Sequence, residues 1–307
     1  MAKVLLTRRI PSSVFSLLAS CHDVDLFTGD SPFDAIPRDE LLRRVAGKDA
    51  LIATLNDKVD REVLDAAPGL KIVANIGVGY DNIDAPAVRA RGIVVTNTPD
   101  VLTEATAELT WGLILGIARR IAEGDRLIRA GGWKGWALDF MLGTELRGKQ
   151  LGIIGRGRIG RAVAAKAPAF GMKAVFAKHD MSMDELFVSS DVISIHTPGA
   201  PELRHLINRR TLMRMKRTAL LVNVARGSIV DEEALAWALD ERLIAGAALD
   251  VFEREPEVHP GLLKHENVLL VPHLGSATRE TRTAMTELAV RNVIAVLAGD
   301  PPLTPIA

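Results

Sequence analysis

A glycine-rich loop constrains the fold of this chain more than any other feature. Residues 155–160 read Gly-Arg-Gly-Arg-Ile-Gly, between the apolar run Leu151–Ile154 and the helix-prone stretch Arg161–Ala169. In a strand–loop–helix unit the first glycine makes a tight turn and the second lets main-chain N–H groups approach a pyrophosphate. The third lets the helix pack on the strand, and the helix N-terminus stabilises the phosphate charge. The loop predicts a dinucleotide-binding domain whose cofactor contacts are Gly155, Arg156, Gly157, Arg158, Ile159 and Gly160.

The residues after the next predicted strand bear on the choice of cofactor. An acidic residue about twenty positions beyond the loop usually binds the ribose hydroxyls of NAD. Here Lys178 stands at that position, with His179 beside it. A lysine cannot accept from a 2′-hydroxyl but attracts a 2′-phosphate, so the sequence favours NADP, with Arg156 and Arg158 as candidate helpers. Asp180 follows closely, and a small change of register would give it the acidic role and favour NAD.

Short β-branched runs alternate with helical stretches along the chain, the pattern of parallel sheets wrapped by helices. Strands are predicted at Lys3–Leu6, Ala50–Thr54, Lys71–Ile76, Ile93–Thr96, Leu151–Ile154, Ala174–Ala177, Val192–His196, Ala219–Val224, Ala247–Val251 and Val268–Pro272. A long helix is predicted over residues 104–129 and a final one over 280–298. The chain has 307 residues, more than a typical single domain, so two compact units are expected.

Composition excludes several classes of protein. Lysine plus arginine and aspartate plus glutamate number 38 each, so no net charge attracts nucleic acid or lipid. No run approaches the ~20 apolar residues of a membrane helix, and the N-terminus is interpreted as a strand rather than a signal peptide. The single cysteine, Cys21, fits a reducing compartment and is interpreted as a buried small residue. The seven histidines lack metal-ligand spacing. We expect a soluble, cytoplasmic protein without a metal site.

Three polar residues follow later strands of the second half. They are Arg226, Glu255 and His273. The carboxyl ends of parallel strands form the ligand crevice of an open sheet. Reduction of a 2-keto acid needs a cation for the carboxylate and a proton donor for the developing alkoxide. Arginine suits the first task and histidine the second, and a glutamate can orient the histidine and raise its pKa.

At these residues the chain resembles the D-isomer-specific 2-hydroxyacid dehydrogenase family. The matching motifs are Gly77–Asp84, Asn97–Asp100, Gly155–Gly160, His196–Pro198, Asn223–Ser228, Asp250–Phe252 and Pro272–Thr278. The resemblance implies two doubly wound α/β domains. A Rossmann dinucleotide-binding domain, residues 97–277, is inserted in a flavodoxin-like substrate domain of residues 1–96 and 278–307, with the active site in the cleft between them. One departure is a segment between Lys178 and Asp191 that is shorter than is usual in the family.

The resemblance also implies roles for individual residues. Arg226, Glu255 and His273 form the catalytic triad, and main-chain N–H groups at Val78 and Gly79 help bind the substrate carboxylate. Asp250 holds the nicotinamide carboxamide. The remaining cofactor contacts implied are Thr103, Thr197, Pro198, Val224, Ala225, His273 and Gly275.

Within the family, the segment Leu142–Gly148 and two nearby tryptophans resemble glyoxylate and hydroxypyruvate reductases. Leu55 stands where that group has an apolar residue near the substrate. The resemblance further implies a homodimer formed through the dinucleotide-binding domain, and we hypothesise that Trp136 reaches the partner's active site; interface packing alone is the other interpretation.

The expected activity is reduction of glyoxylate or hydroxypyruvate. Two other functions stay open. One is a dehydrogenase of a larger or phosphorylated substrate, for which Arg8, Lys58 and Arg61 are candidate cations. The other is a non-catalytic dinucleotide sensor on the same fold.

Overall fold

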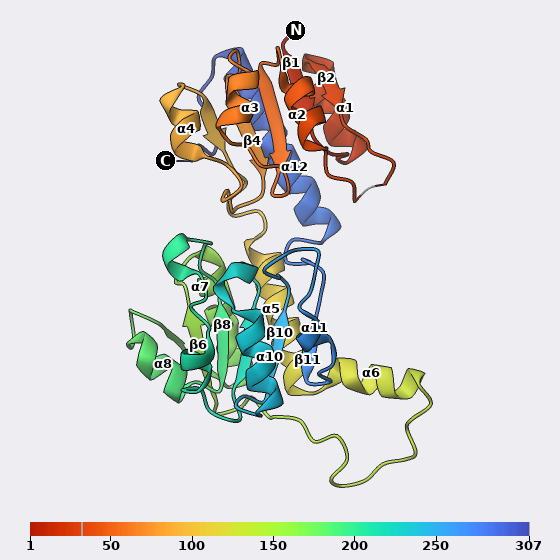
Figure 1. Cartoon of the computed structure of the whole chain (residues 1–307), viewed down its shortest axis with the longest axis vertical. Coiled ribbons are helices and arrows are strands. Elements are labelled where there is room, and N and C mark those ends of the chain that lie inside the picture. The colour runs from red at the N-terminus through yellow and green to blue at the C-terminus, as the bar shows by residue number, and fades with distance from the viewer. Residues whose placement is uncertain (32, 307) are drawn as a thin grey trace. The chain divides into compact units, whose positions relative to one another are not determined.

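The computed structural model describes residues 1–31 and 33–306. They form two compact units, one of Met1–Leu102 with Thr278–Ala307 and the other of Thr103–Ala277. Each unit is built on one parallel sheet with helices on both faces (Figure 1). The predicted fold class is therefore confirmed.

The first unit contains a five-stranded sheet in its described residues. Its strands are β1 (Lys3–Leu6), β2 (Asp23–Leu26), β3 (Ala50–Thr54), β4 (Ile72–Ile76) and β5 (Val94–Thr96). Its helices are α1 (Ser12–Cys21), α2 (Arg38–Val45), α3 (Arg61–Ala66), α4 (Ala85–Ala90) and α12 (Arg279–Ala298). The strand order β2-β1-β3-β4-β5 is that of a flavodoxin-like sheet, with its switch point between β1 and β3.

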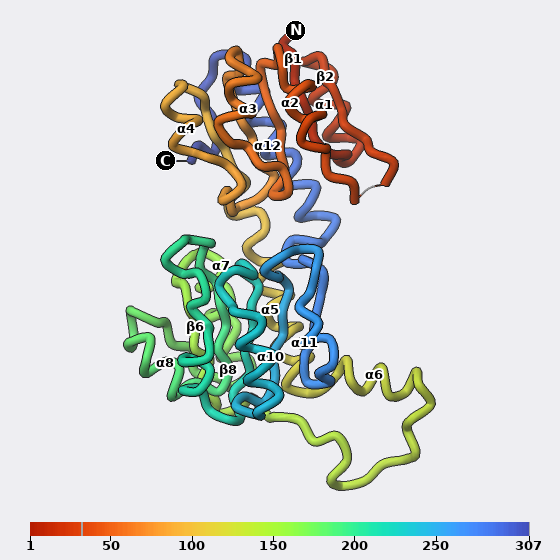
Figure 2. The backbone as a smooth tube through the Cα atoms, viewed as in Figure 1, coloured from red at the N-terminus to blue at the C-terminus, as the bar shows by residue number. Residues whose placement is uncertain are grey.

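Alternating strand side chains explain why helices cover both faces of this sheet. Leu5, Leu51 and Val73 pack with apolar residues of α2, α3 and α4 on one face. The neighbouring Val4 and Ile52 pack with α1 and α12 on the other. The first unit thus needs α12, which follows the whole second unit in the sequence, to complete the cover of this second face (Figure 2).

The second unit contains a six-stranded parallel sheet in the order β11-β10-β9-β8-β6-β7 within the described part of the chain. Its strands are β6 (Gln150–Ile154), β7 (Lys173–Phe176), β8 (Val192–Ile195), β9 (Leu220–Asn223), β10 (Gly246–Leu249) and β11 (Val268–Leu270). Its α-helices are α5 (Thr103–Ala118), α6 (Ile121–Arg129), α7 (Arg158–Lys166), α8 (Met183–Ser189), α9 (Arg209–Leu212), α10 (Glu232–Asp240) and α11 (Pro260–Leu263). Short 3₁₀ helices are η1 (Ala167–Phe170), η2 (Pro201–Leu203) and η3 (Gly227–Ile229).

Two apolar layers enclose the second sheet. Helices α5 and α7 pack on one face, where the Trp111 indole donates to the Val163 carbonyl at 3.1 Å and stacks on Phe170. Helices α8 and α10 pack on the other face through residues such as Leu186 and Leu235. The switch point lies between β6 and β8, so a ligand is expected at the carboxyl ends of these strands.

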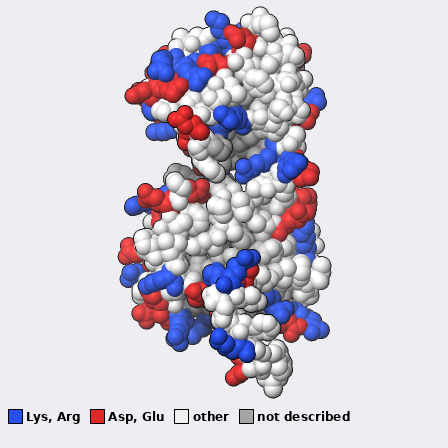
Figure 3. Space-filling model, turned by 90° about the vertical axis from the view of Figure 1, so that its right-hand side faces the viewer, with Lys and Arg blue, Asp and Glu red and all other residues white. Residues whose placement is uncertain are grey.

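The helix predicted over residues 104–129 is in fact two helices. Arg120 adopts a left-handed conformation with φ of 55°, which ends α5 and turns the chain into α6. Helix α6 and residues 130–145 extend from the body of the second unit as an arm (Figure 1). The exposed large apolar side chains of this arm are Ile121, Ile128, Trp133, Trp136, Leu138, Phe140 and Leu142. In Figure 3 acidic and basic groups are scattered over the face in view, including its lower end.

Three further features differ from the sequence prediction. Strand β2 and helix α1 were not predicted; β2 is a short edge strand with two aspartates in four residues, which weakens its apolar signal. Cys21 is exposed at the end of α1, not buried.

The chain leaves the first unit at Leu102 rather than at residue 96. The segment between them stays in this unit because Asn97 and Thr304 share two hydrogen bonds and the Thr98 amide donates to the Gly77 carbonyl.

Candidate functional site

The glycine loop joins β6 to α7, and its three glycines have different surroundings. Gly155 has φ of 107°, and a Cβ there would lie 2.4 Å from the His196 carbonyl oxygen. A Cβ on Gly160 would lie 2.1 Å from the Gly155 carbonyl oxygen. Packing of the protein itself therefore requires both of these glycines. A Cβ on Gly157, in contrast, would meet no described atom within 4 Å.

The open space at Gly157 fits the pyrophosphate of a dinucleotide. No side chain caps the N-terminus of α7, which begins directly after Gly157. The main-chain N–H groups and the dipole at this helix end favour an anion. The Ile159 side chain is partly buried and packs against the core. The loop thus has the glycine pattern that dinucleotide binding requires.

A tight turn follows β7 and leads directly into α8. The Lys178 amide donates to the Met181 carbonyl at 2.8 Å, and Lys178 adopts a left-handed conformation with φ of 63°. Ser182 and Glu185 then form a capping box at the start of α8. The described sheet consequently ends at β7, in agreement with the short segment noted after Lys178.

The polar side chains of this turn make different contacts. The Asp180 carboxylate accepts from the Phe176 amide at 2.8 Å and so stabilises the turn. The Arg156 guanidinium lies 5.6 Å from the centre of the Phe176 ring, and its Nη1 is 3.5 Å from His179 Nδ1. Lys178 and His179 are exposed. The structure thus brings His179 to Arg156 of the glycine loop, while Asp180 is engaged by its own backbone.

The predicted triad residues follow three strands in the second unit. Arg226 follows β9, Glu255 follows β10 and His273 follows β11, and these strands are neighbours in the sheet. His273 Nδ1 lies 2.8 Å from Glu255 Oε2. The Phe252 amide donates to Glu255 Oε1 at 3.1 Å. Both carboxylate oxygens of Glu255 therefore have a hydrogen-bond partner. Glu255 orients the imidazole through Nδ1, and Nε2 is the ring nitrogen that Glu255 does not contact.

The surroundings of Glu255 favour its ionised form. Burial has the largest single effect and by itself would raise the pKa of this carboxyl, but the hydrogen bond and charge of His273, together with two further groups, outweigh it. The Phe252 amide and the Arg226 charge also lower the pKa, which lies below its ordinary value. A carboxylate that stays ionised can stabilise a positively charged imidazole beside it.

Asp250 organises the chain on the other side of His273. Its side chain is buried and accepts from the Leu274 amide and, at 2.9 Å, from the Gly275 amide. Burial raises the pKa of Asp250, with the hydrogen bonds acting in the opposite direction. Thr106 Oγ1 donates to the Gly275 carbonyl at 3.1 Å. Asp250 thus fixes the turn that carries His273.

Arg226 lies in a turn that packs directly on the loop after β10. Asn223 Nδ2 donates to the Arg226 carbonyl at 2.8 Å, and Asn223 Oδ1 accepts from the Ala225 amide. A Cβ on Gly227 would lie 1.9 Å from the Phe252 carbonyl carbon. Only glycine permits this approach, so Gly227 lets the Arg226 turn and the Glu255 loop pack together.

The first unit carries the predicted carboxylate-binding loop after β4. Asn97 Nδ2 donates to the Val78 carbonyl at 2.8 Å, and Asn75 Nδ2 donates to the Gly79 carbonyl at 2.8 Å. The amides of Val78 and Gly79 have no hydrogen-bond partner within residues 1–31 and 33–306. Because the carbonyls of Val78 and Gly79 are both hydrogen-bonded within the protein, the two consecutive N–H groups of these residues can bind an anion.

The other predicted contact residues lie at strand or helix ends. Thr103 begins α5, Thr197 and Pro198 follow β8, Val224 and Ala225 follow β9, and Leu55 follows β3 with an exposed side chain. Trp136 is exposed on the arm.

Sequence reasoning did not single out the asparagines Asn75, Asn97 and Asn223. Each lies in the last residues of a strand or directly after one, and each fixes a loop that carries a predicted site residue. Asn97 and Asn223 begin two of the motifs that carry the family resemblance, whereas the signal for Asn75 is a polar residue near the end of an apolar strand.

Two negative findings apply to the described part of the chain. No group of three histidine, cysteine, aspartate or glutamate side chains there could hold a metal ion. No helix there is long and apolar enough to cross a bilayer.

Comparison with known proteins agrees with this arrangement. Residues 111–275 match the family model described as D-isomer specific 2-hydroxyacid dehydrogenase, NAD binding domain. A protein named glyoxylate reductase from Thermofilum pendens is 49% identical, over 98% of this chain and 93% of that protein. The crystal structure of a protein from Thermus thermophilus has a TM-score of 0.94 and 45% identity, covering 99% of this chain and 100% of that one.

A crystal structure described as an NADPH-dependent glyoxylate/hydroxypyruvate reductase from Sinorhizobium meliloti, in complex with NADP and malonate, is also similar. Its TM-score is 0.86 and its identity 34%, covering 100% of this chain and 97% of that one. The family match, the extent of identity and the glycine loop with its neighbouring strand ends lead to one conclusion. This chain belongs to the D-isomer specific 2-hydroxyacid dehydrogenase family of oxidoreductases.

Proposed function

We propose that this enzyme reduces a small 2-keto acid, glyoxylate or hydroxypyruvate, to the corresponding 2-hydroxy acid, of D configuration where C2 is a stereocentre. The observation that carries the proposal is the 2.8 Å contact between His273 and Glu255, in the unit that also holds the glycine loop. The relative from Thermofilum pendens and the Sinorhizobium meliloti structure, named for these activities, support this choice of substrate.

Substrate binding is assigned to three groups. The Arg226 guanidinium binds the substrate carboxylate as a planar fork, and the Val78 and Gly79 amides donate to the same carboxylate. The exposed side chain of Leu55 forms an apolar wall beside the small substrate. Fixing the keto acid in this way supplies orientation, which is a large part of the rate gain in such reactions.

His273 is the proposed proton donor. A bound reduced nicotinamide supplies the hydride that adds to C2 of the keto acid. His273 Nε2 gives its proton to the oxygen on C2 as negative charge develops there, because Nδ1 is engaged by Glu255. The ionised Glu255 stabilises the imidazolium before transfer and keeps the ring oriented.

We also assign a preference for NADPH to this enzyme. Arg156 and His179 lie together beside the turn that carries Lys178, and the positive charges of Arg156 and Lys178 suit a 2′-phosphate. Asp180, the alternative acceptor for the ribose of NAD, already accepts from the Phe176 amide. Besides the loop glycines, the assigned cofactor contacts are Thr103, Arg158, Thr197, Pro198, Val224, Ala225, Asp250 and Gly275.

Lys178→Ala tests the cofactor assignment. We expect the KM for NADPH to rise about 10-fold and the KM for NADH to change less than about 2-fold, because one charge-assisted contact to the 2′-phosphate is lost. Steady-state kinetics with both cofactors and glyoxylate gives the two values. Equal changes for both cofactors would remove Lys178 from 2′-phosphate recognition.

The primary test of activity is the loss of reduced-nicotinamide absorbance with glyoxylate or hydroxypyruvate. Rapid loss supports the proposed reductase. Turnover only with larger or phosphorylated 2-keto acids would instead favour that class of substrate. Cofactor binding without turnover on any of them would favour a sensor.

We further propose a homodimer formed through the second unit, with the arm of residues 121–145 packing on a second copy. Seven large apolar side chains are exposed along this arm, as given above, and an interface would remove them from water. Sedimentation should give a mass twice that of the chain. A monomer at micromolar concentration would contradict the proposal.

Trp136→Ala tests whether the arm also contributes to the partner's active site. The expected result is a KM for hydroxypyruvate about 5-fold higher in a protein that remains dimeric, because an apolar contact worth ~1 kcal/mol is lost. An unchanged KM and substrate preference would restrict Trp136 to interface packing. Leu138→Ala, a neighbouring exposed residue, is the matched control.

The lowered pKa of Glu255 predicts a pH-dependent contribution to stability. Because the folded-state pKa is depressed, the stabilisation is present above the unfolded pKa of about 4.3 and is lost as pH falls through the folded value. Glu255→Gln should therefore lower the Tm at pH 7, and the difference from wild type should shrink below about pH 4. Scanning calorimetry at both pH values checks this. A difference in Tm that is independent of pH would contradict it.

A further inference from the structure

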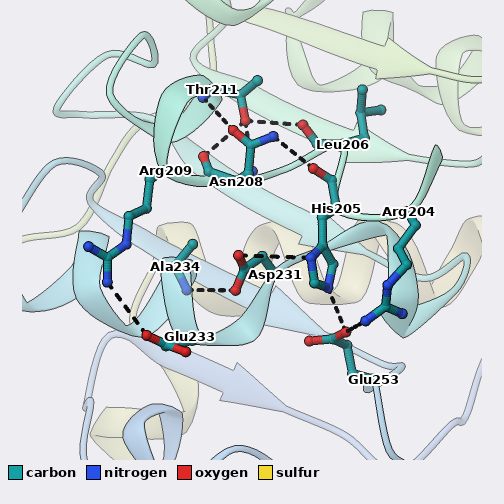
Figure 4. A network of polar contacts seen from close by, with 10 residues as sticks. All are labelled: Arg204, His205, Leu206, Asn208, Arg209, Thr211, Asp231, Glu233, Ala234 and Glu253. Carbon is teal, nitrogen blue, oxygen red and sulfur yellow. Dashed lines mark hydrogen bonds and ion pairs between the residues drawn. The ribbon is translucent and has the colours of Figure 1, made fainter. Parts of the chain in front are cut away.

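A polar network lies beside the loop that carries Glu255. His205 Nε2 is 2.6 Å from Glu253 Oε1, and Arg204 Nη2 donates to the same oxygen at 3.0 Å. Asp231 Oδ2 lies 3.9 Å from His205 Nδ1. Figure 4 shows the imidazole of His205 between the two carboxylates. The ring thus has an acidic partner at each nitrogen.

His205 connects the two segments that carry catalytic residues. Its main-chain amide donates to the Ser228 carbonyl at 2.9 Å, two residues beyond Arg226. Its ring contacts Glu253, two residues before Glu255. One residue therefore bonds through its backbone to the Arg226 turn and through its side chain to the Glu255 loop.

The loop after β10 is short and closely held elsewhere. The Glu253 amide donates to Glu232 Oε1 at 2.7 Å, and the His259 amide donates to Glu232 Oε2 at 3.1 Å. Glu232 is buried at the start of α10. These hydrogen bonds fix the main chain of the loop at residues 253 and 259. A change in the side-chain contact of Glu253 should therefore shift the position of Glu255, two residues further on.

The backbone of His205 is itself unusual. Its φ is 53°, in the left-handed region that costs non-glycine residues energy. Asn208 Nδ2 donates to the His205 carbonyl at 2.8 Å and helps to hold this conformation. The fold thus maintains an unfavourable backbone geometry that directs the ring at Glu253.

We propose that His205 and Glu253 are positioning residues that keep Glu255 at hydrogen-bonding distance from His273. The proposal rests on the function proposed above, since it assigns them a role in that reaction through Glu255. Nothing in it requires either residue to touch the substrate.

The test uses His205→Asn in the full chain. Asparagine tolerates the left-handed conformation and leaves the amide bond to Ser228, but its shorter side chain does not reach Glu253. We expect kcat for glyoxylate reduction to fall about 10-fold, as a small misplacement of a catalytic group would cause, with KM changed less than about 2-fold. His205→Gln retains a donor near the position of Nε2 and should restore most of kcat.

Arg209→Ala is the matched control. Arg209 pairs with Glu233 at 3.6 Å in the same view but does not contact Glu253, so kcat should stay at the wild-type value. If His205→Asn does not fold, Glu253→Gln replaces it, with an expected loss of about 3-fold in kcat because the charge of the hydrogen bond is removed.

A second measurement does not depend on turnover. Carbon-13 NMR of the Glu255 carboxyl should give a higher titration midpoint in His205→Asn, because the pairing with His273 that lowers the pKa of Glu255 is weakened. If wild type reduces no 2-keto acid but this midpoint rises, the proposed function fails and the positioning role stands. An unchanged midpoint, an unchanged kcat, or a His205→Gln variant as impaired as His205→Asn would overturn the proposal.

Discussion

His273→Ala is expected to lower kcat for glyoxylate reduction by about 10² to 10⁴-fold, the range for loss of a general acid. The hydroxy acid forms only if the oxygen on C2 is protonated, and without the imidazole this proton must come from a poorer donor such as water. The KM for glyoxylate should change little, because Arg226 and the amides of Val78 and Gly79 are assigned to binding. Steady-state kinetics with saturating NADPH measures both values.

The backbone at His273 calls for a second variant. Its φ of 52° disfavours alanine, so part of any loss in His273→Ala could come from a shift of the turn. His273→Asn tolerates this conformation and carries no acidic proton, and it should lose a similar factor in kcat. Near-wild-type turnover in the asparagine variant would remove His273 from proton transfer.

Arg226→Ala is expected to raise the KM for glyoxylate by about 10²-fold, corresponding to about 3 kcal/mol for a charge-assisted contact. The kcat should fall as well, because the carboxylate no longer fixes C2 in the reactive orientation. Initial rates over a wide range of glyoxylate concentration separate the two effects. Unchanged KM and kcat would show that another group binds the carboxylate.

Arg226→Lys separates charge from geometry. Lysine keeps the positive charge but lacks the planar fork, so binding should recover only in part. Full recovery would indicate that a single charge suffices. Both Arg226 variants keep the main-chain carbonyl that accepts from Asn223, so the turn should keep its structure. Comparison of the Tm of each variant with that of wild type checks this.

Much of this architecture could be predicted from local patterns. The glycine loop needs only adjacent residues to specify its strand, turn and helix, and it is found between β6 and α7. Arg226, Glu255 and His273 were placed at strand ends, and parallel strands bring their carboxyl ends to one edge of a sheet. The 2.8 Å contact of His273 with Glu255 follows from the neighbouring positions of β10 and β11.

Other features depend on interactions that no short pattern reveals. The helix break falls on Arg120, a residue with good helix propensity, so the residue type gives no sign of its left-handed backbone. Its guanidinium pairs with Glu123 at the start of α6. Leu102 ends the first unit because Asn97 bonds to Thr304, a contact between residues far apart in the sequence. Strand β2 has too few apolar residues to be distinguished from a loop.

The candidate site also combines features that local sequence predicts with features that depend on tertiary contacts. The residue types suited to the proposed chemistry could be predicted from the sequence, but the contacts that hold their loops could not. Asn75 and Asn97 fix the Val78–Gly79 loop, and His205 bridges two loops. Each acts through a hydrogen bond to a main-chain carbonyl or a neighbouring carboxylate, and such a bond depends on loop geometry more than on residue type.

The position of α12 has a consequence for the order in which the protein folds during synthesis. Domains generally fold as units, the N-terminal one first. Here the sheet of the first unit has one face that α12 must cover, and α12 follows residue 277. Helix α1 covers part of this face, but Ile52 and Ala74, on two strands that α12 contacts, stay open to water or chaperones while the ribosome makes the second unit. The second unit is contiguous, and Thr106 near its start bonds to Gly275 near its end, so it can close by itself. We infer that the chain folds from its middle outward, and that its first hundred residues are the part most exposed to aggregation until the last helix emerges.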